Sequence, residues 1–375
     1  MKDYYKRALW LILKKPRKIP ALIRLQTGVK TVSMRKKKDG ASKPPISIGI
    51  AVTYRCNLRC IQCPQWGESG WLKADPSKLS RELTTSQFKE FIDDVAPFKP
   101  YFQFTGGEPL LREDIFEIIH YADSKNLVTG LTTNGVLLYE NADKIVKSGL
   151  EYLYVSLDGP IDVNKKIRKG SETTSMKTLE GIKEVMRARE RNKSMLPFIE
   201  VRMTVVPENQ DQIYEMAEFV EGEIGPDVFC VMPEFYSTGH MNDETRRIFN
   251  DEFNTDLISL KGYVRDLAGL KAEHIEEQIS RVKDGRWSFR FRLCEPIGKK
   301  GFSFREYIDT PESIMCGITS CGSLYTFTLL EPDGDIVTCA SRPDYVAGNV
   351  LENRFLDIWN GERYRKYRVR VEGGL

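Results

Sequence analysis

The sequence alternates between short apolar runs and longer amphipathic segments, and this alternation constrains the fold more than any other feature. Six apolar runs have the length and composition of buried strands: 46–52, 101–104, 127–131, 152–155, 198–206 and 228–232. The segments between them are typical of helices, namely 84–95, which opens with a Thr-x-x-Gln capping box, 114–124, 141–148, 175–189 and 211–221. Repeated strand–helix units predict a parallel sheet with right-handed crossovers, and therefore an α/β fold.

Polar motifs follow four of these strands directly, and each precedes a helix. They are the cysteine loop at 54–64, Thr105-Gly106-Gly107-Glu108-Pro109, Thr132-Thr133-Asn134-Gly135 and Ser156-Leu157-Asp158-Gly159-Pro160. In a barrel of parallel strands, the loops after the strands open on one face, where active sites gather. We therefore expect the four motifs to line one pocket.

The cysteine loop carries Cys56, Cys60 and Cys63 at C-x3-C-x2-C spacing. A loop this short can direct three thiolates at one inorganic cluster, but its span holds no fourth ligand. One iron of a 4Fe–4S cluster would then remain open for another molecule. The alternative is a structural zinc knuckle, although zinc prefers four closed ligands, usually in paired C-x2-C units.

Taken together, the motifs resemble the radical S-adenosylmethionine (SAM) superfamily over about 46–235, in the family's order along the chain. The resemblance implies a partial (β/α)6 TIM-like barrel with a [4Fe–4S] cluster on the three loop cysteines. It also implies reductive cleavage of SAM to a 5′-deoxyadenosyl radical, which abstracts hydrogen from a substrate carbon, with an electron donor such as flavodoxin or ferredoxin. One residue departs from the family pattern: Gln62 stands where an aromatic side chain usually precedes the third cysteine.

The resemblance also implies roles for the loop that follows the second strand. Gly106 and Gly107 would let backbone groups approach the methionine ammonium of SAM closely, because glycine has no side chain. Glu108 would add an acceptor of suitable charge, and Pro109 completes the motif.

The later loops supply further residues for cofactor binding. By resemblance, Asn134 and Ser156 are candidates for the ribose hydroxyls, Asp158 belongs to the same set, and Arg168 would pair with the methionine carboxylate. Asn134 and Ser156 could instead be helix caps. Arg168 lies in a stretch rich in lysine and arginine, which we expect to be a loop, so plain surface charge is its alternative.

A second group of cysteines lies near the C-terminus. Cys316, Cys321 and Cys339 surround a hairpin-like segment with Pro332-Asp333-Gly334-Asp335, and Trp359 follows. This pattern resembles the SPASM extension of the superfamily, or its shorter twitch relative, and predicts a small α+β region. The chain ends before the further cysteines of a full SPASM domain, so we expect one auxiliary cluster, with Cys294 or a substrate as the fourth ligand. Cys230 lies in an apolar run and is expected to be a buried hydrophobe.

These features divide the chain into a basic amphipathic arm (1–45), a core barrel (46–240), a helical connector (241–290) and an auxiliary-cluster region (291–375). The arm carries fourteen Lys/Arg and two acidic residues, which leaves the remainder net acidic. It could lie on an anionic membrane, dock an acidic partner, or simply pack on the barrel. Because the body is acidic and shows no binding module, we expect no nucleic-acid partner.

The substrate and compartment are less constrained by the sequence. The lack of a signal peptide or membrane span and the clustered cysteines favour a reducing cytoplasm. We expect a peptide substrate first, because the extension most resembles that of peptide maturases, or a small molecule in cofactor or natural-product biosynthesis. The alternatives are a radical SAM enzyme that acts on a lipid or sugar at a membrane surface, and a non-enzymatic iron–sulfur carrier or zinc-bound interaction module.

Overall fold

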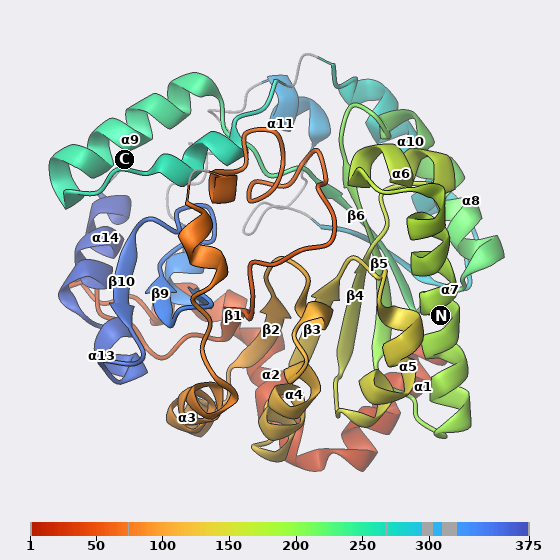
Figure 1. The fold of residues 1–375 in the computed structure, drawn as a ribbon, viewed down its shortest axis with the longest axis horizontal. Helices are drawn as coiled ribbons and strands as arrows, with labels where there is room; N and C mark the ends of the chain where they lie inside the picture. The colour runs from red at the N-terminus through yellow and green to blue at the C-terminus, as the bar shows by residue number, and fades with distance from the viewer. Residues whose placement is uncertain (1, 74, 267–268, 295–302, 310–320, 374–375) are drawn as a thin grey trace.

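The computed structural model describes residues 2–73, 75–266, 269–294, 303–309 and 321–373. A single ten-stranded sheet curves through the molecule, in the order β10-β9-β8-β1-β2-β3-β4-β5-β6-β7 (Figure 1). Its strands are β1 (Ser47–Ala51), β2 (Tyr101–Thr105), β3 (Thr129–Thr133), β4 (Tyr152–Ser156), β5 (Phe198–Val205), β6 (Val228–Pro233), β7 (Arg290–Leu293), β8 (Phe327–Leu330), β9 (Asp335–Val337) and β10 (Val346–Asn349).

The first seven strands are parallel neighbours in sequence order, which confirms the predicted partial TIM-like barrel. The structure adds two parallel strands to the six expected. β7 extends the edge at β6, and β8 pairs in parallel with the other side of β1. Within the described residues β7 and β8 do not pair, so the barrel is open.

Helices cover the outside of the barrel. They are α3 (Thr85–Val95), α4 (Ile115–Ser124), α5 (Leu138–Lys147), α6 (Ile161–Arg168), α7 (Glu172–Arg191) and α8 (Ile213–Glu223). The capping box at the start of α3 is confirmed: the Gln87 backbone N–H donates to Thr84 Oγ1 at 3.3 Å, and the Thr84 N–H donates to Gln87 Oε1 at 2.8 Å. The expectation that Arg168 lies in a loop is wrong. It is the last residue of α6. Most residues of this helix are charged or polar, and only Asn164 and Ile167 are buried.

Side chains along each strand alternate between the hydrophobic core under the helices and the lumen of the barrel. In β5, Ile199 and Val201 are fully buried in the hydrophobic core, whereas Glu200 and Arg202 belong to the opposite face. In β1, Gly49 occupies that lumen face between the core residues Ile48 and Ile50. The lumen is therefore lined by polar and small residues, and the apolar residues pack under the helices.

The C-terminal region is joined to the barrel edge through β8. Before it come α9 (Gly239–Phe253), the 3-10 helix η8 (Ile258–Tyr263), α10 (Ala272–Asp284) and α11 (Phe304–Asp309), and after the strands come α13 (Phe355–Trp359) and α14 (Glu362–Glu372). Ser47 pairs with Phe327 and Ile50 with Leu330, so β8 continues the barrel sheet. β9 and β10 then add in antiparallel fashion. Strand β7 lies at the junction between the predicted connector and the predicted auxiliary-cluster region.

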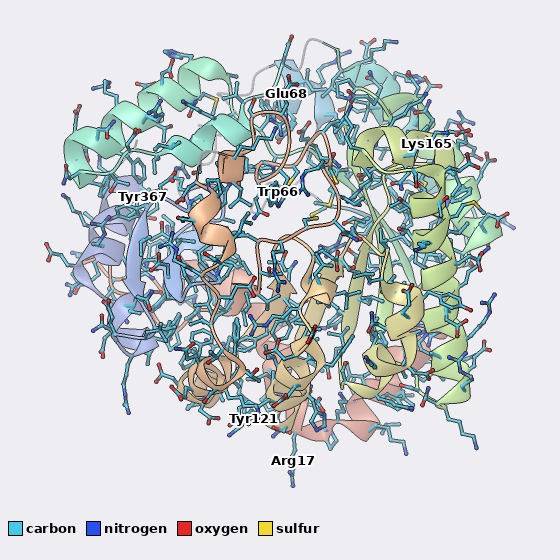
Figure 2. The ribbon with its side chains drawn as sticks, viewed as in Figure 1. Arg17, Trp66, Glu68, Tyr121, Lys165 and Tyr367 are labelled. Carbon is cyan, nitrogen blue, oxygen red and sulfur yellow. The ribbon has the colours of Figure 1, made fainter. Side chains whose placement is uncertain are left out.

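The basic arm forms α1 (Lys2–Lys14) and α2 (Ile19–Gly28) and packs across the end of the barrel where the strands begin (Figure 1). Lys15 and Lys18 both pair with the fully buried Glu151, at 2.8 Å and 2.6 Å. Of the three readings of the arm, packing on the barrel is thus confirmed. The loops after the strands lie at the other end: in Figure 2, Trp66 of the cysteine-rich segment is central, and Arg17 of the arm projects at the lower edge. Among the described helices, none is both long and apolar enough to span a membrane.

Candidate active site

The cysteine loop leaves β1 and is held from several sides. The Ile61 N–H donates to the Ile167 carbonyl at 2.9 Å, which ties the loop to α6. The Trp66 indole donates to the Tyr54 carbonyl at 2.9 Å, and the Arg59 guanidinium stacks 3.9 Å above the Trp66 ring. These contacts fold the loop back on itself and keep its three cysteines half-buried at the barrel mouth.

The three thiols share one electrostatic environment. Burial raises the pKa of Cys56, and it raises the pKa of Cys60 to about 11. Negative charge on Cys63 raises both pKa values further. N–H groups point at the sulfurs: the Leu58 amide lies 3.4 Å from Cys56 Sγ, and the Trp66 amide lies 3.3 Å from Cys63 Sγ. Such donors would stabilise thiolates once a metal replaces the protons.

This donor set suits a cluster better than a single ion. Among the described residues, no group of three His, Cys, Asp or Glu side chains converges on a position for one metal ion. A [4Fe–4S] cluster takes each thiolate on a different iron, so its ligands do not have to converge in this way. Three half-buried thiols from one loop fit a cluster with one open iron.

Gly106 and Gly107 seat the cysteine loop on the end of β2. The Gly107 N–H donates to the Thr53 carbonyl at 2.7 Å, and a Cβ on Gly107 would lie 2.2 Å from the Arg55 carbonyl oxygen. Gly106 has a φ of +138°, which side chains rarely adopt. The space left by the two missing side chains is filled by backbone of the cysteine loop. Their approach to the methionine ammonium stays a prediction.

Glu108 is fully buried and uses its carboxylate to join two loops. Its oxygens accept hydrogen bonds from the Leu110 N–H at 3.0 Å, the Thr133 hydroxyl at 2.8 Å and the Asn134 N–H at 2.8 Å. Burial raises its pKa in spite of these donors. Pro109, also buried, starts the short turn that follows. The carboxylate thus orients the Asn134 loop, and its proposed contact with SAM is untested.

Asn134 reaches the cysteine loop, and Ser156 lies at the end of β4. The Asn134 amide donates to Asn57 Oδ1 at 2.7 Å and lies 4.0 Å from Cys56 Sγ. Ser156 is half-buried at the end of β4, where it pairs in register with Arg202. Both side chains are at the barrel mouth, as expected for loops that follow parallel strands.

A buried network connects Asp158, Arg168 and Gln62. Asp158 Oδ2 lies 2.7 Å from Arg168 Nε and accepts a 2.7 Å hydrogen bond from the Gln62 amide, while Oδ1 accepts from the Thr204 N–H at 2.9 Å. Arg168 Nη1 also lies 3.9 Å from Cys60 Sγ. Gln62, which departs from the family pattern, is the polar residue through which the cysteine loop bonds to Asp158.

Inside the barrel, a second charged cluster was not anticipated from the sequence. Glu200 accepts from Arg202 at 2.7 Å and from Arg292 at 2.6 Å. The Arg202 guanidinium also stacks 3.6 Å above the Tyr154 ring. The strands were predicted as apolar runs, so charged residues on their inner face were not expected, and β7 was not predicted at all.

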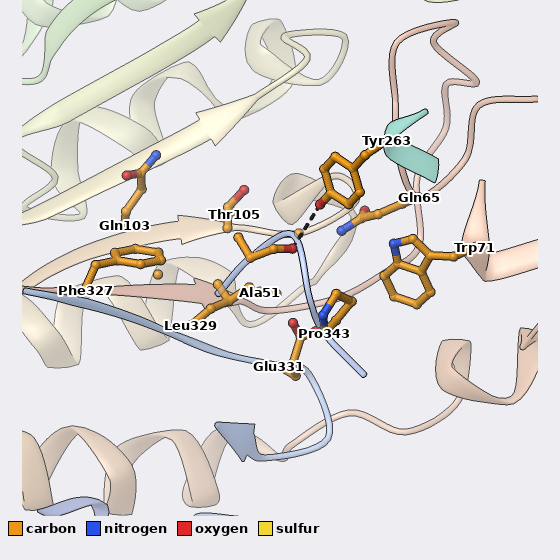
Figure 3. Close-up of a pocket in the computed structure, with 13 residues that line it drawn as sticks. Ala51, Gln65, Trp71, Gln103, Thr105, Tyr263, Phe327, Leu329, Glu331 and Pro343 are labelled. Atoms are coloured by element: carbon orange, nitrogen blue, oxygen red, sulfur yellow. Dashed lines mark hydrogen bonds between the residues drawn. The ribbon is translucent and has the colours of Figure 1, made fainter. Parts of the chain in front are cut away.

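A cavity of about 250 Å³ adjoins the glycine loop (Figure 3). It lies between β1, β2, the cysteine-rich segment, η8 and β8, and it is lined in part by Gly49, Gln65, Gly106, Tyr263, Leu329 and Glu331. The Tyr263 hydroxyl donates to the Ala340 carbonyl at 2.9 Å. A Cβ on the neighbouring Gly262 would lie 2.2 Å from the Pro64 carbonyl oxygen. The backbone of η8 therefore packs directly against the cysteine loop.

The C-terminal cysteines are only partly described. Cys339 Sγ lies 3.1 Å from Ser341 Oγ and 3.8 Å from Arg342 Nη1, and Arg342 is electrostatically coupled to both Cys339 and the exposed Cys321. Cys316 lies outside the described residues.

Cys294 has a partner in the barrel. The neighbouring Cys230, which is buried as expected, and Arg292 lower the pKa of the Cys294 thiol. Its role as a fourth auxiliary ligand stays a prediction.

Comparison with known proteins identifies the family. The radical SAM superfamily profile matches residues 50–220. AdoMet-dependent heme synthase of Methanosarcina barkeri is 32% identical over 330 residues, which cover 86% of this chain and 85% of the relative. The chain belongs to the radical SAM superfamily. It is an enzyme that uses a [4Fe–4S] cluster and SAM, so the non-enzymatic alternatives are set aside.

Further matches support the C-terminal region and the fold. An iron–sulfur cluster-binding domain, SPASM, matches residues 321–373, which supports an auxiliary cluster there. Fe-coproporphyrin III synthase of the same organism is 38% identical over 319 residues, which cover 82% of this radical SAM enzyme and 72% of the relative. The crystal structure of Streptococcus suis SuiB bound to its precursor peptide SuiA has a TM-score of 0.61 at 15% identity, covering 92% of this chain and 70% of SuiB. That likeness supports the fold alone.

Proposed function

We propose that this radical SAM enzyme abstracts hydrogen from a porphyrin-type cofactor precursor. The observation that carries the proposal is that two relatives at 32% and 38% identity, each matched over more than four-fifths of this chain, are named as synthases of haem-type products. When bound, the cluster and SAM supply a 5′-deoxyadenosyl radical. The protein's own residues hold these groups and position the substrate carbon.

The cavity is suited to hold one substituent of a larger substrate. Its volume of about 250 Å³ is just below the range of roughly 300–1,000 Å³ that is usual for ligand pockets. Because Gly106 forms part of its wall, a group in the cavity would lie beside the glycine loop. Trp71, Phe327 and Leu329 also line it, and apolar walls exclude water from a reactive intermediate.

The test is an anaerobic assay of the reconstituted enzyme with SAM and dithionite, and then with reduced flavodoxin or ferredoxin, the donors that we propose. Formation of 5′-deoxyadenosine and methionine is measured with and without iron coproporphyrin III. We expect the porphyrin to raise 5′-deoxyadenosine formation and to be converted itself. Cys56→Ala should abolish both products, whereas Cys230→Ala, outside the cysteine loop, should retain SAM cleavage. SAM cleavage without any porphyrin conversion would reject this substrate class.

A peptide substrate is the second candidate. It is favoured by the C-terminal extension, whose cysteine and hairpin pattern resembles that of peptide maturases, and by a cavity large enough for one amino-acid side chain. A short peptide encoded beside the gene would be incubated under the same conditions. A SAM-dependent mass change in that peptide, with none in the porphyrin, would favour this candidate.

We also propose that the basic arm contacts an anionic membrane surface. Leu9, Ile12, Leu13 and Ile23 are exposed on α1 and α2, and Leu13 is 67% exposed. Lys14 and Arg17 are exposed near them, as in helices that lie on lipid headgroups. The alternative of a lipid or sugar substrate at a membrane surface would also require this contact.

Flotation with phosphatidylglycerol vesicles, compared with phosphatidylcholine vesicles, tests this contact. We expect the wild type to float with the anionic vesicles and a Leu9→Ser/Leu13→Ser variant to remain in the aqueous fraction. Equal behaviour of the two proteins on both lipids would rule the surface out.

A further inference from the structure

Glu331 presents a buried carboxyl group to the cavity. It follows β8, and alternation in that strand puts it on the same face as Phe327 and Leu329, which line the cavity with it (Figure 3). Glu331 is only 2% exposed, and its Oε2 has no hydrogen-bond partner among the residues that the structure describes. The side chain therefore reaches the cavity with unused hydrogen-bonding capacity.

The surroundings of Glu331 disfavour the charged form of its carboxyl group. Burial raises its pKa well above the ordinary value, and charges on Asp333, Asp335 and Asp344 raise it further. Each of these aspartates has a partner of its own: Arg81 at 3.9 Å for Asp333, the Asn349 amide at 2.9 Å for Asp335, and the Ser259 N–H at 2.9 Å for Asp344. None of the ion pairs found among the described residues involves Glu331, and the raised pKa favours the protonated form, which can donate a hydrogen bond.

Comparison with Glu108 shows that this arrangement is unusual within the molecule. Glu108 is equally buried, but its oxygens accept three hydrogen bonds from the protein. Buried polar groups normally find partners, and an unpartnered one costs folding free energy. A carboxyl that stays unpartnered beside a cavity is explained most simply if the partner arrives with the substrate.

We propose that Glu331 is a substrate-binding residue whose buried, unpartnered carboxyl group donates a hydrogen bond to an acceptor oxygen, such as a carboxylate, on the group that enters the cavity. The choice of a carboxylate-bearing substrate rests on the proposed function. The contact itself rests on the geometry, a buried and unpartnered carboxyl oxygen at the cavity wall, and the raised pKa supports the role of donor. Sites built around one polar contact discriminate strongly against ligands that lack it, because the buried group is then left unpaired.

The binding test uses the reconstituted holoenzyme and iron coproporphyrin III as the probe, titrated by absorbance. Glu331→Gln keeps a neutral donor of similar shape, so we expect its Kd to stay within about threefold of the wild type. Glu331→Leu removes the donor and should raise the Kd by on the order of 10- to 100-fold. Glu352→Leu, at an exposed glutamate, is the control and should bind as the wild type does.

The outcomes separate the two proposals. Equal Kd values for all four proteins would overturn the role of Glu331. Equal weakening by Gln and Leu would also overturn it, because an ionised carboxylate that binds a cation would then be required. Failure of the wild type to bind the porphyrin would count against the proposed substrate class instead, and the following measurement still tests Glu331.

Thermal unfolding as a function of pH needs no substrate. An acid whose folded pKa lies above its unfolded value of 4.5 loses stability as the pH rises from that value towards the folded one. Glu331→Gln has no proton to lose, so its Tm should exceed that of the wild-type holoenzyme at pH 8 by a few degrees, with the difference shrinking towards pH 4.5. A lower Tm for Glu331→Gln at pH 8 would show an ionised, paired carboxylate and would overturn the proposal.

Discussion

The buried charges at the barrel mouth are arranged so that each supports the cysteine loop. Asp158 is fully buried and receives contacts from Arg168 on α6, Gln62 on the loop and the Thr204 N–H on β5. Arg168 is 11% exposed and also approaches Cys60 Sγ. Removing one partner of such a pair leaves an uncompensated buried charge, which is far less favourable than an intact pair.

We therefore expect Arg168→Met to lower the free energy of unfolding of the apoprotein by about 3–5 kcal/mol, because Asp158 loses its cation. Arg191→Met is the matched control: Arg191 is 48% exposed and pairs with Asp143 at 3.0 Å and with Glu184 at 2.8 Å, so its loss should change stability far less, because water screens surface ion pairs. Denaturant unfolding measures both variants. Similar losses in the two would show that Asp158 does not depend on Arg168.

At the scale of elements, the site depends on how closely the cysteine loop packs on the end of β2. Gly107 is the contact point, with the Arg55 and Tyr54 carbonyl oxygens at 2.2 Å and 2.6 Å from where a Cβ would be. These neighbours are backbone atoms, so they cannot move aside as a flexible side chain would. A side chain on Gly107 must displace the whole loop.

Gly107→Ala should therefore lower the iron content of the reconstituted protein severalfold and destabilise it by about 1–3 kcal/mol through overpacking. Gly222→Ala on α8 is the control. Nothing lies within 4 Å of its added Cβ, and alanine favours the helix by up to about 1 kcal/mol. Iron analysis and thermal unfolding report the two effects, and full iron loading of Gly107→Ala would contradict the packing argument.

Elements with a regular pattern were predictable, and those that depend on distant pairing were not. The six apolar strands and the capped helix α3 follow from periodicity and a local motif. β7, with alternating exposed and half-buried residues, is a strand only because it pairs with β6. The cysteines and the glycine loop were found from spacing. The burial of Glu331 could not be predicted from the sequence, because it depends on the pairing of β8 with β1, in which Phe327 lies opposite Ser47.

At the scale of the whole molecule, the C-terminal region extends the barrel sheet beyond β1. β8 covers the edge of β1, and Phe355, Trp359 and Tyr364 belong to the same hydrophobic cluster as Ile48 and Ile50. Without this region, β1 would be an apolar edge strand with unpaired backbone groups, which is a common cause of aggregation. The auxiliary-cluster region thus also acts as a structural part of the catalytic domain.

We expect a protein that ends at residue 320 to aggregate, because both the β1 edge and this cluster become exposed. Removal of residues 1–14 is the comparison, since Leu11 contributes only to a small cluster with Leu196 and Phe198. That variant should stay monodisperse, with a lower Tm. Size-exclusion chromatography distinguishes the two, and a well-behaved 1–320 protein would show that the barrel folds without its C-terminal partner.

The arm and the catalytic mouth lie at opposite ends of the same barrel. An enzyme resting on a bilayer through Leu9 and Leu13 would turn its mouth towards the water, away from the acyl chains. Its substrate and its reductant would then arrive by diffusion from the aqueous side. Adsorption of this kind would concentrate the enzyme along a surface without giving it access to the lipids beneath, which favours a water-borne substrate over a membrane-embedded one.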